Sequence, residues 1–407
     1  SVAPGSNALP AKVGGGTLSL TTTLAGGEII GQIAATGTTP MTFRLTDNAT
    51  GLFTDREIDI VGESALYTWS PNPFTFGAAR LNGGGAPPST THADTLYGAT
   101  LQNYIDKGTY SSAAWRTNTA YFKLGASGVD SAENGFQLWT VPVTGTYTIK
   151  AYGASGGGLE SAATSTWASS PTEPTYGGFG AWTQGNFNLT KGEKVLIIVG
   201  HVGRCGPADG TTSAGSGGGG GTYVLKELGA SSAISNASIY CIAGGGGGGR
   251  QYDQTSSTHT PNRVPGDGIA SQAAEITSGG GGSGSASYVS GGGAGYFANG
   301  NVPSSTSSGY EAQRPYIGAQ GGYGSWGWGQ TSVYGNRYGG FGGGGGNGAH
   351  DPGGGGGYQG GGGSSFGYDS AQVSQGGTSR NNGIAGTISF GNSTETEANG
   401  KVIITLI

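Results

Sequence analysis

The stretch from Gly217 to Gly363 constrains this chain more than any other feature, because it holds long runs of glycine. Glycine destabilises a regular helix or strand by roughly 0.5–1 kcal/mol per residue relative to alanine, so a run of six begins about 3–6 kcal/mol in deficit. Ordinary helices and strands are not built from such runs. Runs of four or more glycines occur at Gly217–Gly221, Gly244–Gly249, Gly279–Gly282, Gly342–Gly346, Gly353–Gly357 and Gly360–Gly363.

Backbone hydrogen bonds between runs can offset this deficit, at about 0.5–1.5 kcal/mol net per bond. A glycine segment with three residues per turn, polyglycine II, has no internal hydrogen bonds and no Cβ, so neighbours can approach it from every side. A single run gains nothing, because water satisfies its backbone equally well. The runs therefore predict a bundle of polyglycine II helices at about residues 217–363. The alternative is low-complexity disorder, since 90 glycines and 16 prolines make up about a quarter of the chain.

The charge content limits the partners of the chain. Charged residues are 10% of its 407 residues, against about 25% in typical globular proteins. A net charge of −5 without any basic cluster argues against nucleic acid and against an anionic membrane surface. The longest apolar run, near Val195–Val199, is far shorter than the roughly 20 residues that span a bilayer. We expect a neutral, polar surface, no membrane insertion and no nucleic-acid partner.

Alternating apolar residues and turn signals predict an all-β protein of two domains. Residues 1–70 read as a small β-sandwich-like attachment or stalk module, with alternation at Met41, Phe43 and Leu45. Pro71-Asn72-Pro73 marks a boundary, because proline restricts the preceding residue to extended conformations. Residues 71–407 then form the glycine-rich domain, in which one short helix is expected between Leu96 and Ala114.

Strands flank the glycine region on both sides in sequence. Residues 136–150 predict an antiparallel hairpin with Tyr147, Ile149 and Ala151 facing inward, and residues 187–199 predict a second pair around the turn Lys191-Gly192-Glu193. Further strands are expected at 222–228, 238–243, 386–390 and 401–407, the last with a buried apolar end that closes the sheet. This pattern predicts a β-sandwich into which the glycine bundle is inserted from one end.

Several of these segments occur in the order of a known module. They are Phe74–Ala78, Trp139-Thr140-Val141-Pro142, Thr144–Tyr147, Gly153–Gly157, Gly192-Glu193, Ile197–Gly200, Gly219–Val224, Ile242–Gly244, Gly249-Arg250 and Gly339–Gly346. In these motifs, from about Phe74 to Ile407, the chain resembles the glycine-rich domain of the anaplastic lymphoma kinase and leukocyte tyrosine kinase receptor ectodomains and of phage and viral fibre-like adhesins. The resemblance implies a jelly-roll-like sandwich with inserted polyglycine II helices and no enzymatic activity. The chain departs from the receptors in lacking a transmembrane segment, a kinase and most of their cysteines, which favours the viral or bacterial branch.

The sequence offers little that points to catalysis, a cofactor or a metal. His92, His201, His259 and His350 are scattered without cysteine or carboxylate at ligand spacing, so we expect no metal site. No phosphate-binding loop and no local nucleophile with a base is present, so we expect no enzyme and no cofactor. Cys205 and Cys241 are either a disulfide or two buried free thiols. Asn-x-Ser/Thr sequons leave glycosylation open.

An aromatic cluster separates two sets of glycine runs and is the best candidate for binding. Tyrosine and tryptophan give large contact area at low entropy cost amid small polar residues, as in binding surfaces. The alternative is that these rings only cover the glycine bundle and pack against it, because the bundle has no side chains of its own. The candidate receptor-binding residues are Tyr316, Tyr323, Trp326, Trp328, Tyr334 and Tyr338.

These observations together predict a non-enzymatic surface adhesin or fibre component of a virion, most simply of a phage. Its glycine bundle would hold loops toward a host-surface glycan or protein, and its N-terminal module would attach to other virion or filament subunits, with a homo-oligomer expected. We expect it at the virion surface or outside cells, with the cell surface as an alternative. The alternative functions are a structural decoration or filament subunit, and the ligand-binding ectodomain of a receptor.

Overall fold

The structure is a computed structural model of the whole chain. It describes residues 64–78, 114–124, 135–158, 177–204, 215–227, 234–249, 266–278, 280–283, 290–301, 311–323, 338–348, 351–364, 374–395 and 398–407, and the backbone of four strands before them. The chain divides into two compact units, Ser1–Thr68 with Pro142–Thr144, and Trp69–Val141 with Gly145–Ile407.

The first unit contains two small antiparallel sheets. Strands β1 (Thr23–Ala25) and β2 (Glu28–Ile30) form one, and the ten-residue strands β3 (Gly37–Thr46) and β4 (Phe53–Gly62) form the other. The register places Met41 opposite Ile58, so the apolar alternation seen in the sequence lies on paired strands. The role of this part as an attachment module stays a prediction.

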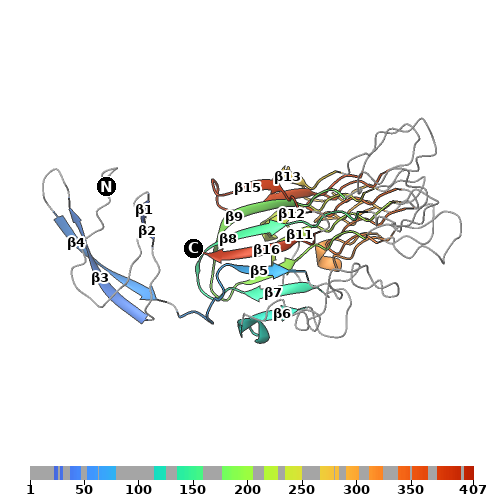
Figure 1. Cartoon of the computed structure of the whole chain (residues 1–407). Helices are drawn as coiled ribbons and strands as arrows, with labels where there is room; N and C mark the ends of the chain where they lie inside the picture. The colour runs from blue at the N-terminus through green and yellow to red at the C-terminus, as the bar shows by residue number, and fades with distance from the viewer. Residues whose placement is uncertain are drawn as a thin grey trace. The chain divides into compact units, whose positions relative to one another are not determined.

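The second unit contains two larger sheets in a β-sandwich-like arrangement (Figure 1). The five-stranded sheet has the order β15 (Ser389–Asn392), β9 (Ala181–Leu189), β8 (Gly145–Tyr152), β16 (Lys401–Leu406), β5 (Phe74–Gly77). The seven-stranded sheet has the order β13 (Ile269–Gln272), β14 (Thr378–Asn381), β12 (Ile239–Ala243), β11 (Thr222–Lys226), β10 (Lys194–Ile198), β7 (Phe136–Thr140), β6 (Phe122–Leu124). Among the strands that the structure describes, only β13 and β14 pair in parallel.

The described residues contain no α-helix. Their helical turns are 3₁₀-helices, η1 (Ala114–Thr117), η3 (Asn236–Ser238) and η4 (Pro315–Ile317). The helix expected between Leu96 and Ala114 lies outside the described residues, apart from its last position. The fold class is therefore mostly β, as the sequence predicts.

The two hairpins predicted from the sequence are wrong. Strands β7 and β8 belong to different sheets, and so do β9 and β10, so each connection crosses between the layers. Trp139 on β7 and Tyr147 on β8 are both fully buried, and their rings meet 5.7 Å apart between the sheets. Burying two such large rings against each other, in an edge-on contact, favours separate layers over pairing within one sheet.

The two crossings are bonded to each other, which holds them in place. The Val141 N–H donates to the Glu193 carbonyl oxygen at 2.9 Å, and the Gly192 N–H donates to the Val141 carbonyl oxygen at the same distance. Gly192 has φ +83°, a conformation that favours glycine at this turn. The sequence identified this turn correctly but treated it as the turn of a hairpin, whereas it connects strands of different sheets.

The prediction of a buried last strand is confirmed in part. β16 lies between β8 and β5, with Val402 and Ile404 fully buried. Ile407 is 57% exposed, so the apolar end is not buried throughout. The inward face predicted for β8 is confirmed, because Tyr147, Ile149 and Ala151 are fully buried while their neighbours are not.

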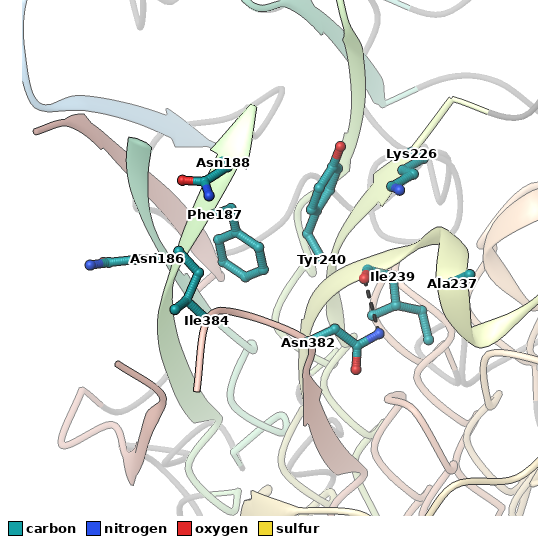
Figure 2. A pocket seen from close by; sticks show the side chains of 9 residues that line it. All are labelled: Asn186, Phe187, Asn188, Lys226, Ala237, Ile239, Tyr240, Asn382 and Ile384. Atoms are coloured by element: carbon teal, nitrogen blue, oxygen red, sulfur yellow. Dashed lines mark hydrogen bonds between the residues drawn. The ribbon is translucent and has the colours of Figure 1, made fainter. Parts of the chain in front are cut away.

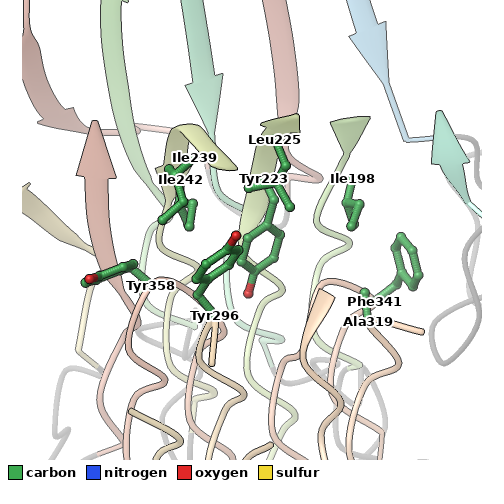
Figure 3. Packing of buried hydrophobic residues seen from close by; sticks show 9 residues of the cluster. All are labelled: Ile198, Tyr223, Leu225, Ile239, Ile242, Tyr296, Ala319, Phe341 and Tyr358. Carbon is green, nitrogen blue, oxygen red and sulfur yellow. The ribbon is translucent and has the colours of Figure 1, made fainter. Parts of the chain in front are cut away.

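Besides the core between the two sheets, a second hydrophobic core covers the outer face of the seven-stranded sheet. Strands β11 and β12 bury residues on both faces, so this part of the sheet is enclosed on both sides. Figure 3 shows the cluster that fills the outer side, in which strand residues meet rings from the glycine region. Its members are Ile198, Tyr223, Leu225, Ile239, Ile242, Tyr296, Ala319, Phe341 and Tyr358.

Strands of both sheets run directly into glycine segments, which extend together from one end of the sheets (Figure 1). In the run 244–249, residues three positions apart donate hydrogen bonds to the same neighbouring segment. The N–H groups of Gly245 and Gly248 both donate to residues 353–356, at 2.8 and 2.9 Å. The segments bonded to this run are 154–157, 178–181, 216–219, 266, 353–356 and 374–377. The run is thus bonded laterally on all sides.

Two other runs follow the same three-residue rule. Gly354 and Gly357 donate to Gly291 and Ala294, which are also three apart. The run 217–221 donates by the same rule to residues 201–204 and 342–345. Every segment in this network exchanges backbone hydrogen bonds with several others, so no run stands alone.

The bonded network is larger than the stretch 217–363 that the sequence indicated. It also takes in the segments 154–157, 178–181, 201–204 and 374–377, which come before and after that stretch. These segments continue from strands of the sandwich, for example from β8 and into β9. Short glycine clusters therefore join the network where the adjoining strand leads directly into it.

Side chains have no room in this network. A Cβ added at Gly246 would lie 1.9 Å from the Gly178 carbonyl oxygen, and one added at Gly361 would lie 2.0 Å from that of Gln375. Both oxygens are backbone atoms in a bonded lattice and cannot rotate away. Glycine is required at these positions because neighbouring backbones approach too closely for any other residue.

Replacing Gly361 by alanine is expected to lower the free energy of unfolding by about 3 kcal/mol, because the backbone must move to admit the new methyl group. The matched control is Gly362→Ala in the same run, where the nearest atoms would lie 3.5 Å from the added Cβ. That variant should stay within about 0.5 kcal/mol of the parent. Denaturant titration measures both, and equal losses would show that close backbone contact is not the reason for glycine here.

Candidate binding site

Three of the six aromatic residues singled out in the sequence lie in the described part of the chain. Tyr323 and Tyr338 form an isolated antiparallel bridge, are half-buried, and have rings 4.9 Å apart. Trp326, Trp328 and Tyr334 lie outside the described residues. The structure thus brings the two tyrosines that flank this segment together, and receptor binding by the cluster stays a prediction.

Tyr316 packs into the second core. Its ring lies 5.9 Å from that of Tyr296, and its hydroxyl donates to the Lys226 carbonyl oxygen at 3.3 Å. Burial raises the pKa of Tyr316, and the nearby Tyr296 adds to this increase. At least one ring of the predicted cluster therefore contributes to packing.

The rings that seal the glycine network against the sheet were not singled out in the sequence. Tyr223 donates its hydroxyl to the carbonyl oxygens of Gly342 and Gly357, both at 3.2 Å. Tyr358 donates to Asn236 at 2.7 Å, and Tyr296 donates to the Ser235 carbonyl oxygen at 3.1 Å. Each tyrosine fills the second core with its ring and satisfies a polar group with its hydroxyl.

Cysteine and metal chemistry have little support among the described residues. Cys241 is a buried free thiol whose pKa is raised by burial. Because Cys241 is free, the structure does not support the alternative of a Cys205–Cys241 disulfide; Cys205 itself lies outside the described residues. In the part of the chain that the structure describes, no three His, Cys, Asp or Glu side chains gather as a metal site would require, and no helix is long and apolar enough to cross a membrane.

A pocket of about 270 Å³ opens between strands of the two sheets (Figure 2). β9 supplies one wall, and β11, β12 and η3 supply the other. The segment after β14 completes the rim. Its lining residues are Asn186, Phe187, Asn188, Lys226, Ala237, Ile239, Tyr240, Asn382 and Ile384.

Tyr240 is the most constrained side chain of this pocket. Its hydroxyl donates to the Glu193 carboxylate, whose second oxygen accepts the Thr190 N–H at 3.0 Å. The Phe187 ring meets the Tyr240 ring edge-on, with centroids 5.5 Å apart and planes 86° apart. Burial raises the pKa of Tyr240, and the Glu193 hydrogen bond and charge raise it further. The phenol therefore stays neutral and its ring is held in one orientation.

The rim is tied to both sheets by hydrogen bonds. The Asn382 amide donates to the carbonyl oxygens of Asn236 and Ile239, at 2.9 and 3.1 Å, and accepts from the Arg380 guanidinium at 3.2 Å. The Ile384 N–H donates to the Asn186 carbonyl oxygen at 2.8 Å, on the opposite wall. The pocket is thus largely preformed, which lowers the cost of ordering it around a ligand.

The lining contains binding groups and no nucleophile with an adjacent base. It offers aromatic and aliphatic surface, amides, one phenol and one ammonium group. Sequence reasoning missed this pocket because its residues come from separate segments that only the two crossing connections bring together. The Asn-Phe-Asn alternation on β9 was the one local signal, and it reads equally well as an ordinary strand.

Comparisons with known proteins leave the function to be argued from the structure. No protein-family model matches the chain, and no curated protein matches it.

The buried tyrosines predict an alkaline transition. Burial raises the pKa values of Tyr223, Tyr240, Tyr296 and Tyr316 above the value near 10 of an unfolded tyrosine. The stability that this contributes is present below about pH 10 and is lost as the pH rises further, because the unfolded chain loses protons first. Phenolate absorbance is expected to rise in two steps, the second together with loss of the near-ultraviolet circular dichroism signal. A single smooth step near pH 10 with tertiary structure intact would contradict this.

Proposed function

We propose that the chain is a non-enzymatic surface adhesin or fibre component of a virion, in which a rigid glycine scaffold presents host-binding loops. The observation that carries this proposal is the lateral hydrogen bonding of the glycine segments with a period of three residues. Such a network has almost no side chains to rearrange, so it makes a stiff support.

The finer fold belongs to the same proposal. A three-residue repeat whose peptide groups point outward to several neighbours is the geometry of a polyglycine II helix. We assign the runs 217–221, 244–249 and 353–357 to such helices, inserted at one end of a jelly-roll-like sandwich. This assignment agrees with the resemblance to the glycine-rich domains of receptor kinase ectodomains and viral fibre-like adhesins.

The attachment of the aromatic segment to the glycine network supports a presenting role. The Gly339 N–H donates to the Gly322 carbonyl oxygen at 2.9 Å, and the Gly322 N–H donates to Gly344 at 2.7 Å. Together with the Tyr323–Tyr338 bridge, these bonds fix both ends of the segment that carries Trp326 and Trp328. A loop with fixed ends loses less entropy when it binds.

The partners and location follow as parts of this proposal. The segment would meet a glycan or protein on a host surface, while the first unit would attach the chain to other virion subunits in a homo-oligomer. The protein would act at the virion surface or outside cells. The low charge content suits a surface that meets neutral polar partners.

The variant Trp326→Ala/Trp328→Ala tests this function in the full chain. Binding to panels of immobilised glycans and of bacterial cells should fall at least tenfold, since aromatic anchors often contribute about 2 kcal/mol or more to an interface. The melting temperature should stay within a few degrees of the parent. Trp182→Phe on β9 is the control and should keep full binding.

Two outcomes would reject the adhesin function. One is a parent protein that binds neither cells nor glycans, and the other is unchanged binding by the double variant. Filaments or particle decorations of this protein in electron micrographs, with no cell binding, would instead favour the structural role.

A further inference from the structure

The rings of Tyr323 and Tyr338 lie close together where the aromatic segment leaves the glycine network. Their centroids are 4.9 Å apart and their planes are inclined by 38°. This separation is at the short end of the range of about 4.5–7 Å for aromatic pairs. It is also shorter than the 5.9 Å between Tyr296 and Tyr316 in the second core. Two phenol rings joined by a direct bond have centroids only slightly closer, so little movement separates this contact from a covalent link.

The backbone on both sides holds the two rings in contact. The two residues face each other in an isolated antiparallel bridge, where opposite Cβ atoms are about 4.5–5.5 Å apart. Beside the bridge, the Gly339 N–H donates to the Gly322 carbonyl oxygen at 2.9 Å. The Tyr338 carbonyl oxygen accepts the Arg204 N–H at 3.1 Å, and a Cβ added at Gly217 would lie 2.0 Å from the same oxygen. The glycine network therefore prevents the two tyrosines from moving apart.

The two rings are also open to reagents in solvent. Both Tyr323 and Tyr338 are half-buried, so part of each phenol lies at the surface. The tyrosines of the second core differ, since Tyr296 and Tyr358 are fully buried. Burial also raises the pKa of Tyr296, which makes loss of its phenol proton harder. Of these pairs, the one at the base of the aromatic segment is the one that an oxidant in solvent can reach.

Two phenols in contact can be joined by one-electron oxidation. Each phenol gives one electron and one proton to the oxidant and becomes a phenoxyl radical. The unpaired electron is shared with the carbons ortho to the oxygen, and a carbon–carbon bond forms when two such carbons meet. Each ring then loses the proton of that carbon and regains one on its oxygen. The two tyrosines lose two hydrogen atoms in total, and one hydrogen peroxide, used by a haem peroxidase, is reduced to two waters.

We propose that Tyr323 and Tyr338 are a site of oxidative cross-linking, at which a peroxidase with hydrogen peroxide, or another one-electron oxidant, bonds the two rings through carbon. Because the rings are already held together, coupling within one chain needs no encounter between molecules, and this raises their effective concentration. The bond closes residues 324–337 into a covalent loop. The inference does not rest on the adhesin function, since a filament subunit could be cross-linked in the same way.

The first test oxidises the full chain at low concentration. One sample receives one equivalent of hydrogen peroxide and a catalytic amount of haem peroxidase. A second receives photo-oxidised tris(bipyridine)ruthenium with persulfate, a small oxidant that reaches partly covered rings. In both, the monomer is expected to lose the mass of two hydrogen atoms and to gain dityrosine fluorescence.

Peptide mapping then locates the bond. Trypsin cleaves after Arg337, which lies between the two tyrosines in the sequence. In a digest of the denatured, oxidised chain, the peptide that ends at Arg337 should stay joined to the peptide that begins at Tyr338. Fragmentation of the joined peptides should place the bond at Tyr323 and Tyr338.

Variants that keep the rings but remove one phenol test the pair. Tyr323→Phe and Tyr338→Phe should each lower the yield of joined peptides at least tenfold. The matched control is Tyr152→Phe, which removes another half-buried phenol on β8 and should change the yield less than twofold. Unchanged melting temperatures would confirm that the fold is kept in all three.

Three results would overturn the proposal. One is the absence of joined peptides with both oxidants although the oxidant is consumed. Another is a product made mainly of cross-linked dimers, because coupling within the chain should be faster. The third is a parental yield of joined peptides in Tyr323→Phe, which would place the bond at another residue such as Tyr334. The Trp326→Ala/Trp328→Ala variant should still cross-link, so this inference and the adhesin function can fail separately.

Discussion

The backbone hydrogen bond between neighbouring glycine segments is the interaction on which the structure depends. Each run bonds to several others, with partners repeating every three residues, and no side chain separates the backbones. A single such bond contributes about 0.5–1.5 kcal/mol, close to the cost of ordering one glycine. The network is therefore stable only as a whole, because each segment supplies donors and acceptors that water would otherwise satisfy.

The two sheets determine which segments enter this network. Strand β8 leads into residues 153–157, β12 leads into residues 244–249, and residues 217–221 lead into β11. Pairing within the sheets sets the order and spacing in which these segments begin. The tyrosines of the second core then seal the junction, since Tyr223 bonds to carbonyl oxygens of two glycine segments while its ring packs on the sheet side.

In the proposed function, a rigid support of this kind separates stability from recognition. The glycine network leaves few side chains to bind anything, so binding groups are confined to segments that leave it and to the sandwich itself. The aromatic segment is fixed at both ends by the network, whereas the pocket at Tyr240 depends on the two crossings between the sheets. Two surfaces with different chemistry can thus change independently of the scaffold.

The sequence alone determined the mostly β fold, the inward face of β8, the strands at 222–228 and 238–243, and the need for the glycine runs to bond laterally. Each follows from local chemistry: alternation marks Tyr147, Ile149 and Ala151, and missing side chains mark the runs. Only the tertiary structure decided that β7 and β8 lie in different sheets, that short segments such as 154–157 join the network, and that Lys226 and Tyr240 share a pocket. The physical reason is that glycine has no side-chain pattern that could specify a neighbour. The partner of each run is therefore set by the order of the strands to which the runs are connected.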